Sequence, residues 1–221
     1  MLTSYKHHQT LRLISNQMDT TMDSAHEWDN YYKHIRRQNP LRWPDVQAVR
    51  LLSQASLTPN SKILEIACGE GRNTRLLIEN GYDVTVIEQN KVALDIVQDL
   101  YKLPSKKIIC AEVSNGLARL LPSSFDLVFC WGLIHFVKDP VLLLRSLATL
   151  LEEGNKLIIS FTAETDNCDR VGAIQCFYDE QLVRTTLQKG GFNIEQIGLQ
   201  SSLNLQTSKQ EAFYWVLANK R

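Results

Sequence analysis

The stretch KILEIACGEGRNT, residues 62–74, decides the fold of this chain. A run of aliphatic residues leads directly into Gly69 and Gly71, and residues that favour a helix follow them. Glycine tolerates the geometry of a tight turn and lets a ligand approach the backbone closely. Because open α/β sheets bind ligands at the carboxyl ends of their strands, the stretch predicts a strand, a binding turn and a helix. A plain tight turn without a ligand is the alternative interpretation.

Further apolar runs follow this stretch, and each is nearly continuous rather than alternating. Continuous runs are typical of parallel strands that are covered on both faces. The runs are DVTVIE (83–88), KIICAE (107–112), FDLVFC (125–130) and KLIISF (156–161). The helices expected between them cover residues 74–80, residues 90–101 and the segment that begins at Asp139–Pro140. This order predicts a doubly wound, Rossmann-like α/β fold with helices on both faces of a mostly parallel sheet.

The C-terminal part of the chain follows a different pattern. A helix is expected over residues 180–190, and the strands FNIEQIGLQ (192–200) and EAFYWVLANK (211–220) come after it. The short polar link between these two strands is too short for a parallel crossover, so they are expected to pair antiparallel.

The residues before the first strand form a helical layer. The segments EWDNYYKHIRRQ (27–38) and WPDVQAVRLLSQ (43–54) read as helices, punctuated by Asn39–Pro40 and Trp43–Pro44. The sequence therefore predicts a flexible arm over residues 1–25 and one domain over residues 26–221. Within that domain we expect a helical lid over residues 26–60 and a Rossmann-like core over residues 61–221.

Composition and charge limit the function classes. Lys plus Arg and Asp plus Glu number 24 each, so the chain has no general electrostatic attraction to nucleic acid or anionic lipid. No apolar stretch approaches the roughly 18–20 residues of a membrane span, and the start of the chain is a poor signal peptide. These features predict a cytoplasmic protein without nucleic-acid or membrane partners.

The cysteines and histidines do not suggest a metal centre. The five cysteines are odd in number and contain no CxxC pair, so we expect free, buried thiols in a reducing compartment. The His7–His8 pair is expected to be solvated rather than metal-binding, and no metal site is predicted.

Acidic residues near the ends of the first three strands indicate the kind of ligand. Glycine is missing at Ala67 and Arg72, where a dinucleotide fingerprint would need it, and Glu65 suits a ligand that carries a positive amine. Glu88 lies about twenty residues after the turn, where a carboxylate can accept hydrogen bonds from both ribose hydroxyls. A solvent-facing glutamate is the alternative for Glu88. Glu112 is a weaker candidate, for the amino group of an adenine.

The fourth strand leads into the segment CWGLIHFVKDP, residues 130–140. Cys130 and Trp131 are expected at the mouth of the site, and His135 follows on a helical turn. A histidine can act as a general base near neutral pH, although such a residue more often caps or packs.

Together these blocks resemble the class I S-adenosylmethionine (SAM)-dependent methyltransferases over residues 62–220. The string ACGEGRNT followed by GYDVTVIEQN is similar to the tellurite-resistance and methyltransferase-11/12-like branches. The resemblance implies SAM as cofactor, S-adenosylhomocysteine as product, and a seventh strand inserted antiparallel between the fifth and sixth. It also implies a set of cofactor-binding residues: Glu65, Ala67, Gly69, Gly71, Asn73, Glu88, Gln89, Glu112, Val113, Cys130 and Trp131.

The expected acceptor is a small molecule with an oxygen, nitrogen or sulfur nucleophile. Its pocket is expected under an aromatic roof made of Trp28, Tyr31, Tyr32 and Trp43. These aromatic residues would alternatively only dock the N-terminal helices on the sheet. The chain is expected to be a monomer or a homodimer. A non-catalytic SAM-binding protein and a nucleotide-dependent oxidoreductase on a similar scaffold are the competing functions.

Overall fold

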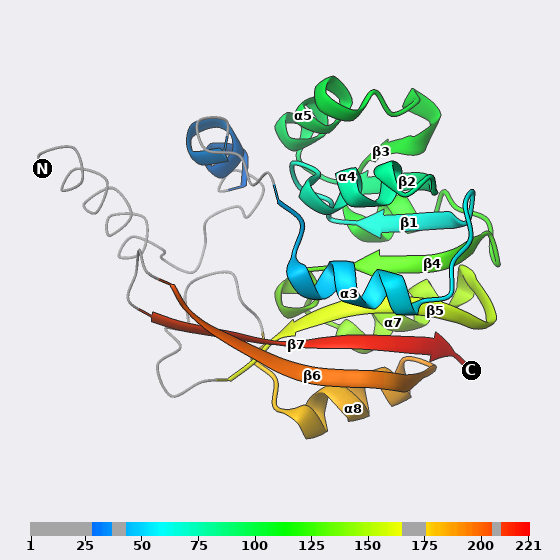
Figure 1. The fold of residues 1–221 in the computed structure, drawn as a ribbon, viewed down its shortest axis with the longest axis vertical. Coiled ribbons are helices and arrows are strands. Elements are labelled where there is room, and N and C mark those ends of the chain that lie inside the picture. Colours follow the sequence, from blue (N-terminus) through cyan, green and yellow to red (C-terminus); the bar gives the residue numbers. More distant parts are fainter. Residues whose placement is uncertain (1–27, 37–42, 165–175, 205–208) are drawn as a thin grey trace, which may run out of the picture.

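The computed structural model describes residues 28–36, 43–164, 176–204 and 209–221. Its centre is a seven-stranded sheet with the order β3-β2-β1-β4-β5-β7-β6 (Figure 1). The strands are β1 (Lys62–Ile66), β2 (Asp83–Glu88), β3 (Ile108–Cys110), β4 (Phe125–Cys130), β5 (Leu151–Thr162), β6 (Phe192–Asn204) and β7 (Lys209–Lys220). Strand β7 pairs antiparallel with both β5 and β6, while β1 to β5 pair parallel. The fold class and the inserted antiparallel strand are thus confirmed.

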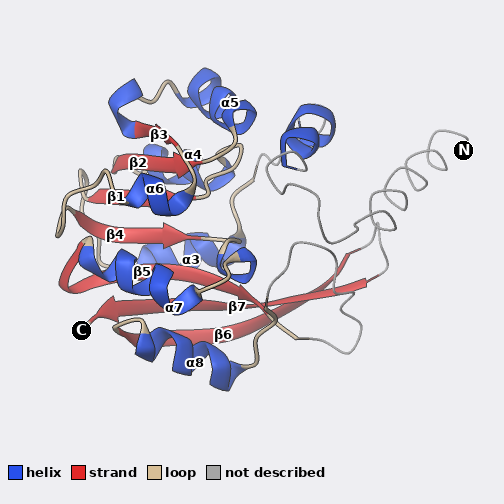
Figure 2. Cartoon of the chain, turned by 180° about the vertical axis from the view of Figure 1, so that it is seen from behind, coloured by secondary structure: helices blue, strands red, loops and turns tan. Residues whose placement is uncertain are grey.

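Helices cover both faces of the sheet, as Figure 2 shows from behind. One face carries α3 (Val46–Gln54), α4 (Arg72–Glu79) and α5 (Lys91–Tyr101), and the other carries α6 (Val113–Leu117), α7 (Pro140–Thr149) and α8 (Glu180–Lys189). The single turns η2 (Ser105–Lys107) and η3 (Ile134–Phe136) lie in loops. The side chain of Asp139 accepts a hydrogen bond from the Leu142 N–H, so the helix start predicted at Asp139–Pro140 is confirmed.

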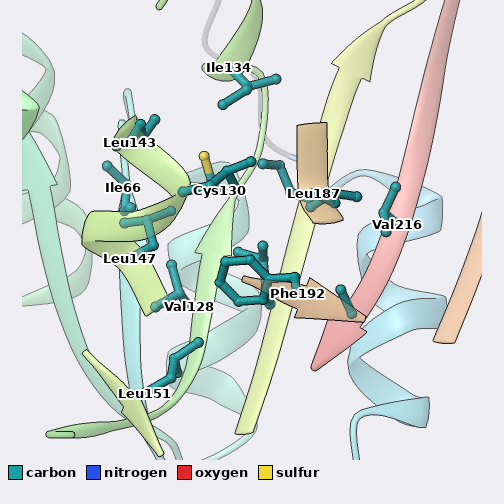
Figure 3. Close-up of a cluster of buried hydrophobic side chains, with 14 of the residues drawn as sticks. Ile66, Val128, Cys130, Ile134, Leu143, Leu147, Leu151, Leu187, Phe192 and Val216 are labelled. Atoms are coloured by element: carbon teal, nitrogen blue, oxygen red, sulfur yellow. The ribbon is translucent and has the colours of Figure 1, made fainter. Parts of the chain in front are cut away.

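Each face of the sheet has its own apolar core. Leu64, Ile66 and Val128 point to the α6–α8 side, whereas Ile63 and Leu127 point to the α3–α5 side. Side chains alternate between the two faces along each strand, so both faces must be apolar when both are covered. Figure 3 shows the first cluster, in which α7, α8 and β4 meet.

The strand boundaries differ from the prediction mainly at β5. The strand begins at Leu151 rather than at Lys156, because Leu151 pairs with Phe125 and the register then shifts before Leu127. Gly154, inside this irregular stretch, has a φ of 84°. Polar residues and a glycine hide the first half of the strand from a search for apolar runs.

The N-terminal layer is helical in its described parts. Residues 28–30 are α-helical and η1 (Tyr31–Arg36) is a π-helical segment, which lies beyond the carboxyl ends of β1 and β2 (Figure 1). Helix α3 buries Ala48, Leu51 and Leu52 against the sheet. The predicted arm, residues 1–25, and His7–His8 lie outside the described residues, so the domain boundaries stay predictions.

Of the four described cysteines, two are buried as predicted, one is exposed, and Cys176 is only half-buried. Cys68 and Cys130 are buried, but Cys110 is exposed because it ends the short edge strand β3. Cys168 lies outside the described residues. None of the described helices is long and apolar enough to cross a membrane, and the described residues contain no cluster of His, Cys, Asp and Glu suited to a metal ion.

Candidate cofactor and acceptor site

The turn after β1 is built from left-handed backbone. Ala67, Gly69 and Gly71 have φ values of 53°, 56° and 86°. Glycine reaches this region without strain, whereas an alanine there costs about 1–2 kcal/mol. The Ala67 N–H donates to the Ile87 carbonyl at 2.8 Å, so β2 holds the strained residue in place. The turn predicted from the two glycines is therefore present, and Ala67 supports it at an energetic cost.

The two glycines are required for different reasons. A Cβ atom at Gly71 would lie 2.6 Å from the ring of Tyr101 and 2.9 Å from Val97, so this glycine lets the turn pack against α5. A Cβ atom at Gly69 would lie 2.8 Å from the hydroxyl oxygen of Tyr32. Gly69 therefore lets the N-terminal layer reach the turn.

Glu65 is a buried carboxyl group beneath the turn. Its side chain is 2% exposed, and the Thr74 hydroxyl donates to its Oε2 atom at 2.6 Å. Burial raises the pKa of Glu65 to about 8, against the opposing effects of the Thr74 hydrogen bond and the Arg72 charge. A positively charged ligand at this position would restore the ionised form, because an opposite charge lowers a carboxyl pKa.

Glu88 faces the turn from the end of β2. Its Oε2 atom accepts a hydrogen bond from the Gly69 N–H at 3.1 Å, and its Oε1 atom accepts one from the Asn90 N–H at 2.9 Å. Burial raises the pKa of Glu88, and these backbone hydrogen bonds oppose the rise. Because the residue is only 6% exposed, the solvent-facing alternative is wrong.

Two other predicted cofactor residues have structural partners. Glu112 is exposed and caps α6, accepting hydrogen bonds from the backbone N–H groups of Ser114 and Asn115. These bonds lower the pKa of Glu112 although partial burial alone would raise it. The Asn73 Oδ1 atom accepts the Asp45 N–H at 3.2 Å and so links α4 to the start of α3.

The remaining predicted cofactor residues lie at the carboxyl ends of β2, β3 and β4. Gln89 is exposed, whereas Val113 packs on the α6–α8 core. Cys130 is fully buried in that same core, so its backbone alone is left to face a ligand (Figure 3). Trp131 is partly buried, stacks on Phe129 with ring centroids 5.9 Å apart, and can still present a ring edge.

His135 lies in η3 and is buried, with 9% exposure. Its ring packs on Phe136, and its buried Nδ1 atom has no hydrogen-bond partner among the described residues. Burial lowers the pKa of His135 to about 4, so the imidazole is neutral at pH 7. A buried polar atom without a partner is costly, and it marks a place where a ligand group can bind.

Three of the four predicted roof residues come together. Trp28 contacts Tyr31 and Tyr32, and its ring meets Phe136 edge-on with centroids 5.5 Å apart. This aromatic cluster packs the N-terminal layer on η3, and its role as a roof over an acceptor stays a prediction. Trp43 is 78% exposed and has no ring contact with another described residue.

Two residues at the site were not singled out by sequence reasoning. Thr74 contacts Glu65 from the first turn of α4, and a polar side chain placed soon after the glycines was the available signal. Asn90 caps α5 and also contacts Asp29, 61 residues earlier in the chain. The cap was recognisable from the sequence, but the contact with Asp29 was not.

Comparison with known proteins agrees with this geometry. Residues 64–159 match the family described as a methyltransferase domain, and this match covers β1 to the middle of β5. Residues 64–159 therefore resemble a methyltransferase domain. This match agrees with the resemblance seen in the sequence.

Several similar proteins are named methyltransferases. The chain is 26% identical to a ubiquinone biosynthesis O-methyltransferase of Ralstonia nicotianae over 65% of its own length, and it spans 60% of that protein's length. It is 27% identical to the enzyme of the same name from Xanthomonas campestris, over 82% of this chain and 72% of that one. A phosphoethanolamine N-methyltransferase of Haemonchus contortus, solved with S-adenosylhomocysteine, shares the fold at a TM-score of 0.65 and 13% identity, covering 90% of this chain and 60% of that one.

Proposed function

We propose that this protein transfers a methyl group from SAM to a hydroxyl group of a small molecule. The observation that carries the proposal is the pair of buried carboxyl groups, Glu65 and Glu88, on either side of a left-handed glycine turn. SAM has two cationic groups and a ribose with two free hydroxyls. These two carboxyl groups therefore fit SAM better than they fit the negatively charged pyrophosphate of a dinucleotide.

In this proposal each carboxyl group binds a different part of the cofactor. Glu88 accepts hydrogen bonds from the ribose hydroxyls, and Glu65 stabilises the cationic amino acid end from beneath the turn. Gly69 has no side chain of its own, which lets a ligand approach the backbone of the turn closely. Bound SAM supplies a methyl group already activated by its sulfonium, so the protein mainly has to orient the acceptor and exclude water.

The proposed acceptor position lies under the aromatic cluster of Trp28, Tyr31 and Phe136. These rings pack edge to face, and an aromatic lining of this kind suits a ring-bearing or otherwise apolar acceptor. A hydroxyl nucleophile is proposed because the curated relatives are named O-methyltransferases. The neutral His135 would accept a hydrogen bond from that hydroxyl at Nδ1 and receive its proton while the bond from the methyl carbon to the hydroxyl oxygen forms and its bond to sulfur breaks.

Calorimetric titration of the full chain with SAM, S-adenosylhomocysteine and NAD tests the cofactor. We expect SAM and S-adenosylhomocysteine to bind and NAD not to bind. Binding of NAD without binding of the other two would support an oxidoreductase. A screen with methyl-labelled SAM over small hydroxylated aromatic acceptors then tests the reaction. Tight binding of SAM without transfer to any acceptor would instead support the non-catalytic alternative.

A further inference from the structure

Asn90 forms hydrogen bonds in three directions at the edge of the site. Its backbone N–H donates to Glu88, and its Oδ1 atom accepts the Ala93 N–H at 3.0 Å. Its Nδ2 atom donates to Oδ1 of Asp29 at 2.7 Å. One residue that is 4% exposed therefore joins the proposed ribose carboxylate, the start of α5 and the N-terminal helical segment.

Tyr32 lies three residues after Asp29 and reaches the glycine turn itself. Its hydroxyl oxygen occupies the space directly over Gly69, where only a glycine allows so close an approach. Burial, and secondarily the Glu88 charge, raises the pKa of Tyr32, so its phenol stays neutral and able to donate a hydrogen bond. Tyr32 thus belongs beside the proposed cofactor position rather than in the roof of the acceptor pocket.

We infer that the Asp29–Asn90 hydrogen bond is a latch that holds Tyr32 over the cofactor turn and thereby sets the rate of cofactor exchange. Asn90 acts as a positioning residue, because it affects the ligand through Asp29 and Tyr32. The inference rests on the proposed function, since the ligand whose exchange is controlled is the adenosyl cofactor.

The other contacts of the N-terminal segment are less suited to this role. The Lys33–Asp29 ion pair joins two exposed side chains, and exposed pairs of this kind contribute about 0–1 kcal/mol. The Trp28 ring meets Phe136 edge-on and stacks on Tyr32 with centroids 6.1 Å apart, so it fixes the segment on η3, whereas Asn90 ties the segment to the end of β2. A hydrogen bond between a charged acceptor and a buried donor is stronger and directional, and losing it leaves a buried amide unpaired.

The test compares Asn90→Asp, Asp29→Asn and the double variant that carries both changes. An aspartate at this position still caps α5, but its carboxylate repels that of Asp29, so Asn90→Asp opens the latch. The double variant restores an amide–carboxylate hydrogen bond with its polarity reversed. Lys33→Ala is the matched control, because it removes an ion pair of Asp29 and keeps the latch.

The first readout is the dissociation rate of S-adenosylhomocysteine, measured by stopped flow. We expect about a ten-fold faster rate in Asn90→Asp, recovery to within about two-fold of the wild type in the double variant, and little change in Lys33→Ala. The second readout is hydrogen exchange of the backbone amides of residues 28–36 without ligand, which should be faster in Asn90→Asp alone.

These two readouts separate the latch from the proposed function. If the wild type does not bind S-adenosylhomocysteine, the proposed function is wrong, while hydrogen exchange still measures the latch. If Asn90→Asp releases S-adenosylhomocysteine at the same rate as the wild type, the latch is overturned. A double variant that releases ligand as fast as Asn90→Asp also overturns it, because the effect would then come from the added charge beside Glu88.

Discussion

The Gly69 N–H points at the Glu88 carboxylate across 3.1 Å, and this contact joins the turn after β1 to the end of β2. Glu88 therefore has two tasks, since it satisfies a backbone donor of the turn and is the proposed acceptor for the ribose hydroxyls. Substitution of Glu88 separates these tasks, because glutamine keeps an oxygen for Gly69 but loses the charge.

We expect Glu88→Ala to weaken binding of S-adenosylhomocysteine by ten-fold or more, and Glu88→Gln to weaken it less, since a charged hydrogen-bond acceptor is about twice as strong as a neutral one. Isothermal titration measures both affinities. Glu79→Ala is the control, because Glu79 is an exposed glutamate of α4. Unchanged affinity in Glu88→Ala would place the ribose elsewhere.

Glu65 should make stability depend on pH. Its pKa in the folded protein is raised to about 8 from 4.5, so between these values the folded state holds a proton that the unfolded state has released. The contribution of Glu65 to the free energy of unfolding is therefore complete below about pH 4.5 and is lost as the pH rises towards 8. Glu65→Gln keeps an uncharged side chain at every pH.

Urea unfolding of wild type and Glu65→Gln at pH 5, 6, 7 and 8 measures this effect. We expect the free energy of unfolding of the variant, relative to the wild type, to increase steadily across the series. A difference that stays constant with pH would mean that Glu65 is ionised throughout, and the cationic end of the cofactor would then meet a preformed carboxylate.

Ala67 is expected to be a strained residue that glycine would relieve. With a φ of 53°, it pays the cost of a left-handed alanine, so Ala67→Gly should raise the free energy of unfolding by about 0.5–1 kcal/mol. The matched control is Ala55→Gly, where φ is −75° and glycine should destabilise. Chemical denaturation measures the free energy of unfolding of both variants. Destabilisation by Ala67→Gly would mean that the packing of the Ala67 methyl group outweighs its backbone strain.

His135 is expected to bind the acceptor rather than the cofactor. His135→Ala should lower kcat by about a hundred-fold and leave the affinity for S-adenosylhomocysteine unchanged. His135→Asn keeps a polar atom near the position of Nδ1 and should recover part of the rate. Because the pKa of His135 is about 4, its ionisation should leave the rate flat between pH 6 and 8. If His135→Ala keeps full activity, His135 takes no part in proton transfer and only packs against Phe136.

The sequence by itself determined the parts of the fold that depend on neighbouring residues. Continuous apolar runs give β1, β2 and β4, because a strand covered on both faces needs apolar side chains in succession. The position of Glu88 at the end of β2 likewise follows from local order. The early start of β5 escaped prediction because its pairing with β4 is irregular and its residues are polar.

Only the tertiary structure decided the properties that arise from contacts distant in the sequence. The approach of Tyr101 to Gly71, of Tyr32 to Gly69, and of Asp29 to Asn90 depends on how helices pack, and no local pattern specifies that packing. The raised pKa of Glu65 is of the same kind. A carboxyl group holds its proton at pH 7 because the surrounding fold removes water, and that burial is a property of the assembled sheet and helices rather than of the residues beside it.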